Sequence, residues 1–204
     1  NLRRRCKVSK LLSETKVLLT NVRLSYPALF VPKGFEGQEP KYSACLIVPK
    51  DDLHSLEIIY QAIENAKKEG LARGIWKGAK IPENLKTPLR DGDKERADDP
   101  AFQHSYFINA SSKYAPMVVG KVLDRNTGKA VRLTEEEVYP GCYVNVTINF
   151  YPYNAAGNRG IAAGLGNVQK EADGEPLGGR STAEAEFEFF TEEELDTLLE
   201  DFLK

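Results

Sequence analysis

The chain has 204 residues, of which 41% are hydrophobic and 28% charged, and its formal net charge is −2 at pH 7. This composition predicts one soluble domain of moderate size with tails. It excludes a helical membrane protein, because no apolar run approaches the ~20 residues that a spanning helix needs.

The small net charge hides a division along the chain. Residues 183–204 hold nine acidic residues and one basic residue, or −8, while residues 1–182 hold 27 basic and 21 acidic residues, or +6. A basic body attracts polyanions, and an acidic tail can compete for the same surface. We therefore expect three parts: a flexible basic arm over 1–15, a domain over 16–182 and an acidic tail over 183–204. The arm is basic but lacks the apolar core of a signal peptide.

The first elements of the domain are two strands and a helix. Strands are predicted over 17–26, which Pro27 ends, and over 41–48, with a loop over 30–40 between them. Asp51 or Asp52 can cap the helix that follows.

The predicted helix carries one apolar stripe at helical spacing, which we expect to pack in the core. The stripe consists of Leu53, Leu56, Ile59, Tyr60 and Ile63. Lys67, Lys68 and Gly70 are expected to close the helix.

The segment 71–104 is long, polar and irregular, and such a segment inside a domain is usually functional or disordered. It holds the only tryptophan, Trp76. After it we expect strands over 106–110 and 116–122, a turn over 125–129 and a short acidic connection over 132–140.

The stretch 142–169 predicts a hairpin of two strands. Val144, Val146, Ile148 and Phe150 alternate with polar and aromatic residues, so one face should lie in a core. The second strand should bury Ile161, Ala163 and Leu165, with a turn over 154–158 between the strands. Its other face carries Gly160, Ala162, Gly164 and Gly166. These glycines indicate either a curved barrel strand or the close approach of a ligand.

Several short strands, one inserted helix and glycine bends favour a mainly β fold. A five-stranded Greek-key barrel is the simplest arrangement, and a β-sandwich is the alternative.

Aromatic residues that stand beside basic ones are typical of single-strand binding grooves, because bases stack on rings while cations neutralise phosphates. The alternative for each aromatic is a place in the core; Trp76, for example, could instead anchor its loop. The candidate nucleic-acid-binding residues are Arg23, Lys41, Tyr42, Trp76, Lys77, Lys80, Lys113, Tyr114, Tyr143, Tyr151, Tyr153 and Arg159.

Metal and cofactor sites are not expected. Cys6, Cys45 and Cys142 are odd in number and far apart, and the last two lie in strand-like runs, which favours buried thiols in a reducing compartment. The two histidines, His54 and His104, lack partners at ligand spacing.

An acidic cluster in the irregular segment offers a second hypothesis, in which the chain is a metal-dependent nuclease. Asp91, Asp93 and Glu95 could gather metal ions. The cluster begins like a calcium loop, but Phe102 stands where a Glu is needed. The alternative is a solvated turn.

Seven motifs in order resemble a family of tailed-phage proteins first catalogued as a domain of unknown function. They are YPALF (26–30), KYSACLIVPK (41–50), PLRDGD (88–93), INASS (108–112), YPY (151–153), GIAAGLGNVQ (160–169) and DGEPLGG (173–179). The resemblance spans roughly 17–190; the residues before Ser13 are additional to it.

Members of that family are single-stranded DNA-binding proteins with an OB-type fold. The resemblance therefore implies a non-enzymatic protein that protects single strands during phage DNA replication or recombination in the cytoplasm of the bacterial host. It implies a groove where bases and aromatics stand together, at Tyr42 with Lys41, Trp76 with Lys77, Tyr114 with Lys113, and Tyr151 and Tyr153 with Arg159.

The acidic tail carries the pattern of a short helix. Thr191 and Glu194 have capping-box spacing. An apolar stripe follows on an otherwise acidic segment, so the tail could dock in the basic groove or on a replication partner. The tail residues expected to bind a partner are Glu192, Glu193, Glu194, Leu195, Leu198, Leu199 and Phe202. A phage structural protein whose tail docks a partner is a third hypothesis.

Overall fold

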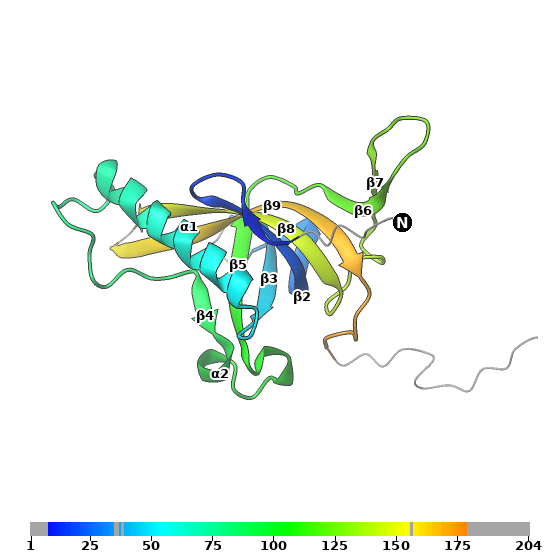
Figure 1. Ribbon diagram of the computed structural model, residues 1–204, viewed down its shortest axis with the longest axis horizontal. Helices are drawn as coiled ribbons and strands as arrows, with labels where there is room; N and C mark the ends of the chain where they lie inside the picture. Colours follow the sequence, from blue (N-terminus) through cyan, green and yellow to red (C-terminus); the bar gives the residue numbers. More distant parts are fainter. Residues whose placement is uncertain (1–7, 35–36, 38, 156, 179–204) are drawn as a thin grey trace, which may run out of the picture.

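The computed structural model describes residues 8–34, 37, 39–155 and 157–178 (Figure 1). The whole acidic tail, over 183–204 and including Glu192 to Phe202, therefore lies outside the described residues, and its predicted helix stays a prediction. The strands are β1 (Lys10–Leu11), β2 (Lys16–Lys33), β3 (Lys41–Pro49), β4 (Leu89–Asp91), β5 (Ser105–Ser112), β6 (Val118–Leu123), β7 (Ala130–Arg132), β8 (Tyr143–Ala155) and β9 (Asn158–Ala172). The helices are α1 (Leu53–Ala72), α2 (Gly92–Glu95) and the 3-10 turn η1 (Pro100–Phe102).

Five of these strands close into a barrel. Neighbours pair in the order β5–β3–β2–β8–β9, and β9 returns to pair with β5. All pairs within the barrel are antiparallel except the closing pair, where Ala110 lies opposite Ala163 and Ser111 opposite Gly164 in parallel register. The five-stranded barrel with a parallel closing pair is an OB-type fold, which confirms the predicted barrel over the sandwich.

The β8–β9 hairpin forms as its sequence pattern predicts. Val144, Val146, Ile148 and Phe150 are fully buried, because alternate side chains of β8 point into the barrel. Ile161, Ala163 and Leu165 of β9 are buried opposite them, as expected. The core therefore lies inside the barrel, between these strands and the inner faces of β2, β3 and β5.

Asn145 of β8 is an exception to the polar outer face, because only 4% of it is exposed. Its Oδ1 accepts a hydrogen bond from the backbone N–H of Asn21 at 3.0 Å, and its Nδ2 donates to Gln169 and Glu171. Asn21 has a positive φ of 55° where the β2–β8 register shifts. The buried amide thus stabilises an irregularity in β2.

Strand β2 is longer than the sequence predicted. Pro27 does not end it, and the predicted loop from residue 30 begins only after Lys33. The β2–β3 register shifts between Ser25 and Ala28, so Pro27 lies in a bulge where its missing N–H costs no ladder hydrogen bond.

The predicted arm also differs in extent. Strand β1 pairs with β2, and Ser9 is buried. The Ser9 carbonyl accepts a hydrogen bond from His54 Nε2 at 2.9 Å, and Ser55 Oγ donates to Ser9 Oγ at 2.8 Å. Residues 8–15 therefore belong to the domain, because they form a hairpin with β2 and contact the start of α1.

Helix α1 begins where the sequence predicted, with the Asp52 carboxylate accepting from the Ser55 N–H at 3.0 Å. Its stripe was partly wrong: Leu56, Ile59 and Ile63 are buried, but Leu53 and Tyr60 are 72% and 50% exposed. Those two residues lie at the edges of the stripe, and Ser55, Ile58, Ala62 and Ala66 are buried in the helix instead.

Gly70 does not end α1, which continues to Ala72. A Cβ on Gly70 would lie only 2.4 Å from the Trp76 ring, so glycine makes room for the tryptophan. The helix packs mainly against β8 and β2 and crosses in front of the β8–β9 hairpin in Figure 1.

The remaining elements lie outside the barrel. The long segment after α1 is ordered by β4, α2 and η1, and β4 extends the sheet beyond β5. Strands β6 and β7 form a hairpin that stands out from the body (Figure 1). Within the described ranges, no helix is long and apolar enough to cross a membrane.

The two described cysteines, Cys45 and Cys142, are buried free thiols, as expected. Burial raises the pKa of Cys45 to about 12, although Arg96 and Arg90 nearby act to lower it. Both thiols therefore stay protonated at neutral pH, because burial raises the pKa of Cys142 as well.

Candidate nucleic-acid interface

Small side chains cross the outer face of the barrel at one register level. Ala28 pairs with Ser43, Ser43 with Ser111, Ser111 with Gly164 and Gly164 with Asn149, so one residue comes from each barrel strand. We call these five residues the small-residue row. Their neighbours along the strands, such as Ala44, Ala110 and Ala163, point into the core. In OB-type barrels oligonucleotides bind on the outer face of the second and third barrel strands, which are β3 and β5 here.

Tyr151 flanks the row at its β8 end. Its side chain points outward and is 41% exposed. A Cβ on Gly164 would lie 3.5 Å from the Tyr151 ring, so the ring lies directly beside this glycine. A flat, exposed aromatic ring next to a glycine leaves room for a nucleobase to stack.

Contacts within the chain explain the glycines at positions 160 and 166 of β9. A Cβ on Gly160 would lie 2.5 Å from the Lys86 carbonyl oxygen, because the loop before β4 passes over this residue. A Cβ on Gly166 would lie 2.2 Å from the Thr147 hydroxyl. The sequence left two explanations for these glycines, a curved strand or the close approach of a ligand. At Gly160 and Gly166 another group does approach closely, but it belongs to this chain. Gly164 alone of the three faces open surface.

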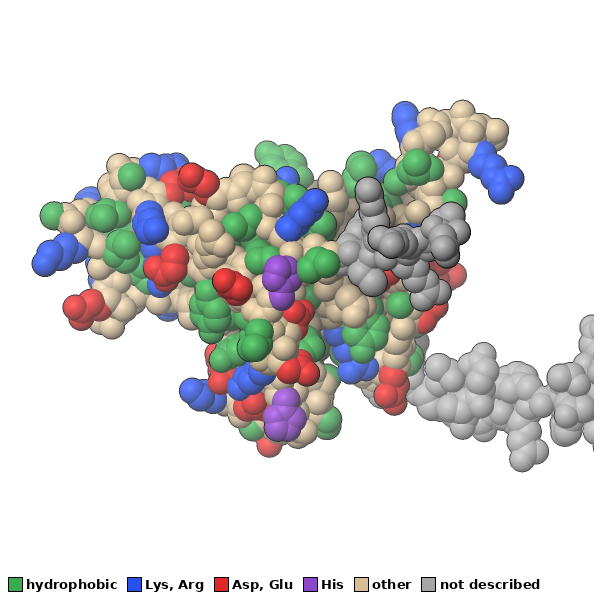
Figure 2. Space-filling view, in the orientation of Figure 1, with side chains coloured by type: hydrophobic (Ala, Val, Ile, Leu, Met, Phe, Trp, Pro, Cys, Tyr) green, Lys and Arg blue, Asp and Glu red, His purple; other side chains and the backbone are tan. Residues whose placement is uncertain are grey.

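Several predicted cations and aromatics lie in two groups near this surface. Near the β8–β9 hairpin lie the half-buried Tyr153 and the exposed Arg159, Lys77 and Lys80. The loop that carries both lysines is joined to the hairpin by a hydrogen bond from Asn154 Nδ2 to the Ile75 carbonyl. Figure 2 shows Lys and Arg side chains at this end of the molecule, and others on the β6–β7 hairpin.

The second group lies where β3 begins and β5 ends. Tyr42 pairs with Ser112, and Tyr114 is 84% exposed two residues later. Lys113 forms a 2.6 Å ion pair with Glu39, which holds the end of β5 to the β2–β3 loop and raises the Lys113 pKa. Lys41 is exposed beside this pair.

Trp76 does not lie on this surface. It is only 4% exposed, and its ring packs against Gly70 and Pro152. Its Nε1 donates a hydrogen bond to the Tyr153 carbonyl at 3.0 Å. The structure therefore supports the anchoring interpretation of Trp76, because a ring buried on both faces cannot stack on a base.

Arg23 and Tyr143 are adjacent, as strand partners, but residues 173–178 cover them. Arg23 Nη2 donates to the Glu175 carbonyl at 2.8 Å. A Cβ on Gly174 would lie 2.9 Å from the Tyr143 ring. These two predicted binding residues thus hold the segment that follows β9 against the barrel.

A loop covers part of the outer face of β3 and β5. Phe102 and Phe107 contact edge-to-face at 5.2 Å and form a small cluster with Cys45 and Ile47. Arg90 lies 5.0 Å from the centre of the Phe107 ring. The sequence did not predict this second apolar cluster, because residues 92–104 show no apolar alternation. The exposed residues beside the cluster, Tyr26, Arg90 and Arg96, were not predicted either.

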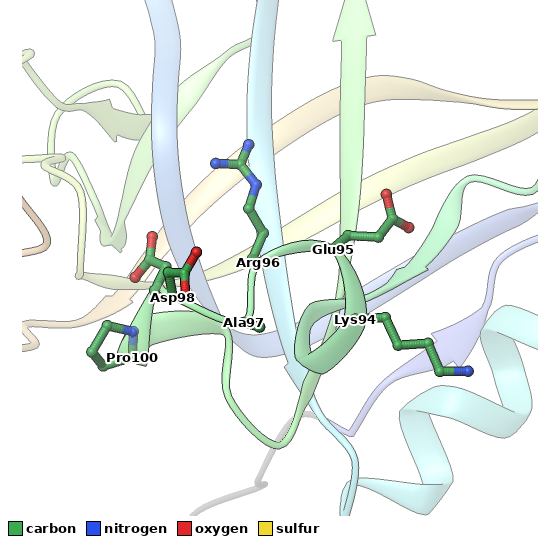
Figure 3. Close-up of a pocket in the computed structure, with 7 residues that line it drawn as sticks. Lys94, Glu95, Arg96, Ala97, Asp98 and Pro100 are labelled. Carbon is green, nitrogen blue, oxygen red and sulfur yellow. The ribbon is translucent and has the colours of Figure 1, made fainter.

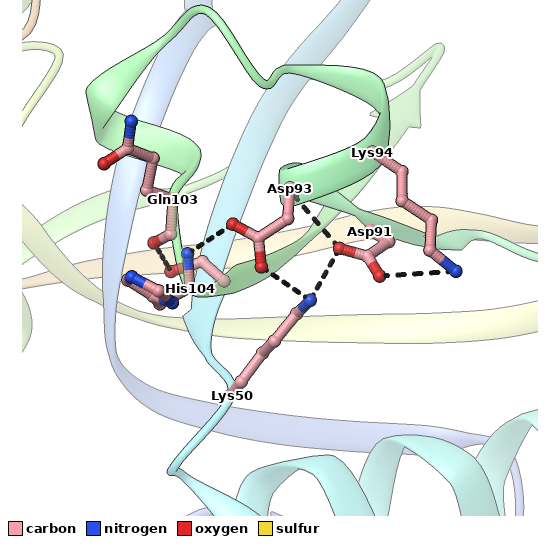
Figure 4. Close-up of polar contacts among 7 residues, drawn as sticks. Lys50, Asp91, Asp93, Lys94, Gln103 and His104 are labelled. Atoms are coloured by element: carbon pink, nitrogen blue, oxygen red, sulfur yellow. Dashed lines mark hydrogen bonds and ion pairs between the residues drawn. The ribbon is translucent and has the colours of Figure 1, made fainter.

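Three acidic residues of this loop form ion pairs with basic side chains, and Figure 4 shows Asp91 and Asp93 bound to Lys50. Lys50 Nζ lies 2.7 Å from Asp91 Oδ1 and 2.8 Å from Asp93 Oδ2, and Glu95 pairs with Arg90. The hydrogen bond from Lys50 lowers the pKa of both aspartates. In the part of the chain that the structure describes, no group of three or more His, Cys, Asp or Glu residues could hold a metal ion.

This arrangement predicts a pH-dependent role for Lys50. The substitution Lys50→Met should lower the midpoint temperature of thermal unfolding at neutral pH, because Asp91 and Asp93 lose the cation that lowers their pKa values. That stabilisation is present above the ordinary aspartate pKa of about 3.9 and is lost as the pH falls through the lower folded-state values. The deficit against the native chain should therefore shrink in acid. Lys68→Met, on the exposed side of α1, is the control; a deficit independent of pH would contradict the assignment.

The fold and its outer face define the class of an OB-type oligonucleotide-binding protein. A family model described as "Enterobacter phage Enc34, ssDNA-binding protein" matches residues 15–199, so the chain belongs to this family. This confirms the resemblance seen in the sequence. A relative, "Putative protein p50" of Acyrthosiphon pisum secondary endosymbiont phage 1, is 34% identical over 181 residues, which cover 84% of this chain and 91% of that protein.

Solved structures agree with this assignment. The single-stranded DNA-binding protein from bacteriophage Enc34 in complex with ssDNA is 30% identical with a TM-score of 0.68, covering 85% of this chain and 99% of that one. The same protein with a C-terminal truncation also gives a TM-score of 0.68. The bacteriophage T7 protein gp2.5, at 14% identity and a TM-score of 0.53, shares the fold.

Proposed function

We propose that this chain binds single-stranded DNA on the outer face of the barrel, without sequence preference and without a catalytic step. The observation that carries the proposal is the small-residue row with Tyr151 at its β8 end, because Ser43 and Ser111 of this row lie on the β3–β5 face that OB-type barrels use. The related Enc34 protein, solved in complex with ssDNA, supports it. Exposed cations near the row, Arg159, Lys77 and Lys80 by the β8–β9 hairpin and Lys41 at the start of β3, would neutralise phosphates.

A titration of fluorescent oligothymidine tests this proposal. Affinity should fall by roughly 0.7 log units per tenfold rise in salt for each phosphate neutralised. Tight binding with no salt response, or no binding, would contradict an electrostatic groove. Incubation with magnesium separates the nuclease hypothesis, since a binder leaves the labelled strand intact and a nuclease shortens it. A phage structural protein would give no DNA shift at all.

We propose that the acidic tail, over 183–204, modulates DNA access or docks replication proteins, and that the protein acts in the cytoplasm of an infected bacterium. The charge of −8 opposite a body of +6 supports competition for the groove.

Removing residues 184–204 should therefore tighten oligothymidine binding, most strongly at low salt, where charges are least screened. The control is a full-length chain in which the tail glutamates and aspartates become glutamine and asparagine. Equal affinities of all three chains across a salt series would leave the tail only a partner-docking role.

A further inference from the structure

Tyr26 has a backbone conformation that tyrosine rarely adopts. Its φ is +43°, in the left-handed region, and Pro27 follows it. A bulky residue there is strained, and such strain persists where the surroundings fix it, often at binding sites. The bulge between Ser25 and Ala28 turns the Tyr26 side chain away from the barrel core, so that 59% of the residue is exposed.

The Tyr26 ring is supported by the loop that covers β3 and β5. Phe102, which is only 1% exposed, stacks behind it with ring centres 6.5 Å apart and an interplanar angle of 25°. The Arg96 guanidinium lies 5.5 Å from the centres of both rings. The ring is thus held in place by an arginine and a buried aromatic.

Arg96 has no ion-pair partner in the described part of the chain, whereas its neighbour Arg90 pairs with Glu95. Figure 3 shows the Arg96 side chain pointing away from Lys94 and toward the barrel strands. An exposed guanidinium without a carboxylate partner, packed beside a ring, can bind a phosphate while the ring binds the attached base.

Tyr26 also stands between two hollows of the surface. One, of about 230 Å³, is lined by Ser25, Asp99, Leu177 and Gly178; the other, of about 450 Å³, is lined by Lys33, Ser43 and Tyr139. Ser43 belongs to the small-residue row and Ala28 lines the same hollow, so Tyr26 flanks the β2 end of the row as Tyr151 flanks its β8 end.

We infer that Tyr26 and Arg96 form a second nucleotide-binding position, in which a base stacks on Tyr26 and its phosphate pairs with Arg96. This inference rests on the proposed function and extends it. The bound DNA would follow the small-residue row around the barrel, from Tyr151 on β8 to Tyr26 on β2. The four intervals between neighbouring β-strands, at 4.7–4.9 Å each, give a path of at least roughly 19 Å.

Three substitutions at Tyr26 separate binding from folding. Tyr26→Gly and Tyr26→Asn remove the ring but suit a positive φ, so both variants should fold. Each should bind oligothymidine roughly 5- to 150-fold more weakly if a base stacks there. Tyr26→Phe keeps the ring and should bind within about 2-fold of the native chain, since stacking needs no hydroxyl.

Arg96→Gln tests the phosphate contact. It should lower the salt slope by about 0.7, whereas Arg125→Gln, an exposed arginine in the β6–β7 turn, should leave the slope unchanged. Oligonucleotides carrying 5-iododeoxyuridine give a direct readout, because ultraviolet irradiation should crosslink the native chain at Tyr26.

The outcomes distinguish this inference from the proposed function. If the native chain binds oligothymidine and the folded Tyr26→Gly and Tyr26→Asn variants bind it with the same affinity, the Tyr26 position is overturned. The DNA-binding proposal would then remain intact. An equal loss of slope in Arg96→Gln and Arg125→Gln would overturn the specific phosphate contact. A native chain that does not bind oligothymidine would overturn both proposals.

Discussion

Trp76→Ala is expected to lower the free energy of unfolding by about 3–5 kcal/mol, the usual cost of removing a buried large aromatic side chain. Trp76 is the residue that joins the end of α1 to the β8–β9 hairpin, through its packing on Gly70 and Pro152 and its hydrogen bond to Tyr153. Its loss leaves a cavity and removes the donor to the Tyr153 carbonyl. Urea denaturation followed by circular dichroism measures the effect.

Two further variants provide comparisons for Trp76→Ala. Trp76→Phe keeps most of the packing but not the N–H, and should fall between the native chain and Trp76→Ala. Leu53→Ala, at a residue that is 72% exposed on the same helix, should change stability little. If Trp76→Ala had the same urea midpoint of unfolding as the native chain but did not bind DNA, the anchoring role of Trp76 would be wrong.

Tyr151→Ala is expected to weaken oligothymidine binding by about 1–3 kcal/mol, or roughly 5- to 150-fold, because an exposed ring beside Gly164 is lost as a stacking surface. Fluorescence anisotropy at fixed salt measures it. Stability should change little, since the ring is 41% exposed.

Matched tyrosines provide the controls for Tyr151→Ala. Tyr151→Phe should bind normally. Tyr60→Ala removes a ring of comparable exposure, 50% against 41%, from α1. Tyr60 lies beside Tyr106, which is on the opposite side of β5 from Asn109 and Ser111. A comparable loss of affinity in Tyr60→Ala would show that the effect does not belong to the outer face.

The strands with alternating apolar residues could be predicted from the sequence, because the alternation is visible within a few neighbouring positions. Every second residue is apolar over 144–150 of β8 and 161–165 of β9, and the barrel buries those residues. Strand β2 was predicted too short because Pro27 normally interrupts a ladder; the bulge that accommodates it depends on pairing with β3. Tyr26 was missed for the same reason, since its positive φ is a property of that bulge.

The facing of the aromatic residues could not be predicted. Trp76 and Tyr151 both stand near basic residues in the sequence, yet one is buried and the other exposed. Gly70 was the available signal for Trp76: a glycine before the end of a helix can mark a place where another side chain packs closely. Residues 173–178 cover Arg23 and Tyr143. The hydrogen bond from Arg23 to Glu175 joins positions 152 residues apart, beyond the reach of any local pattern.

The barrel is closed by a short contact between β5 and β9. The β5–β9 contact has two register pairs, Ala110 with Ala163 and Ser111 with Gly164, while the neighbouring β3–β5 contact has eight. Local opening follows the weakest cooperative contacts, so amide hydrogens at this seam should exchange with solvent faster than those of the other barrel strands. Ser111 and Gly164 are also the middle of the small-residue row, and a strand lying across it would span the seam. Ligand binding and barrel closure would then be linked equilibria: a ligand that prefers the closed barrel slows exchange at the seam and raises the melting temperature together.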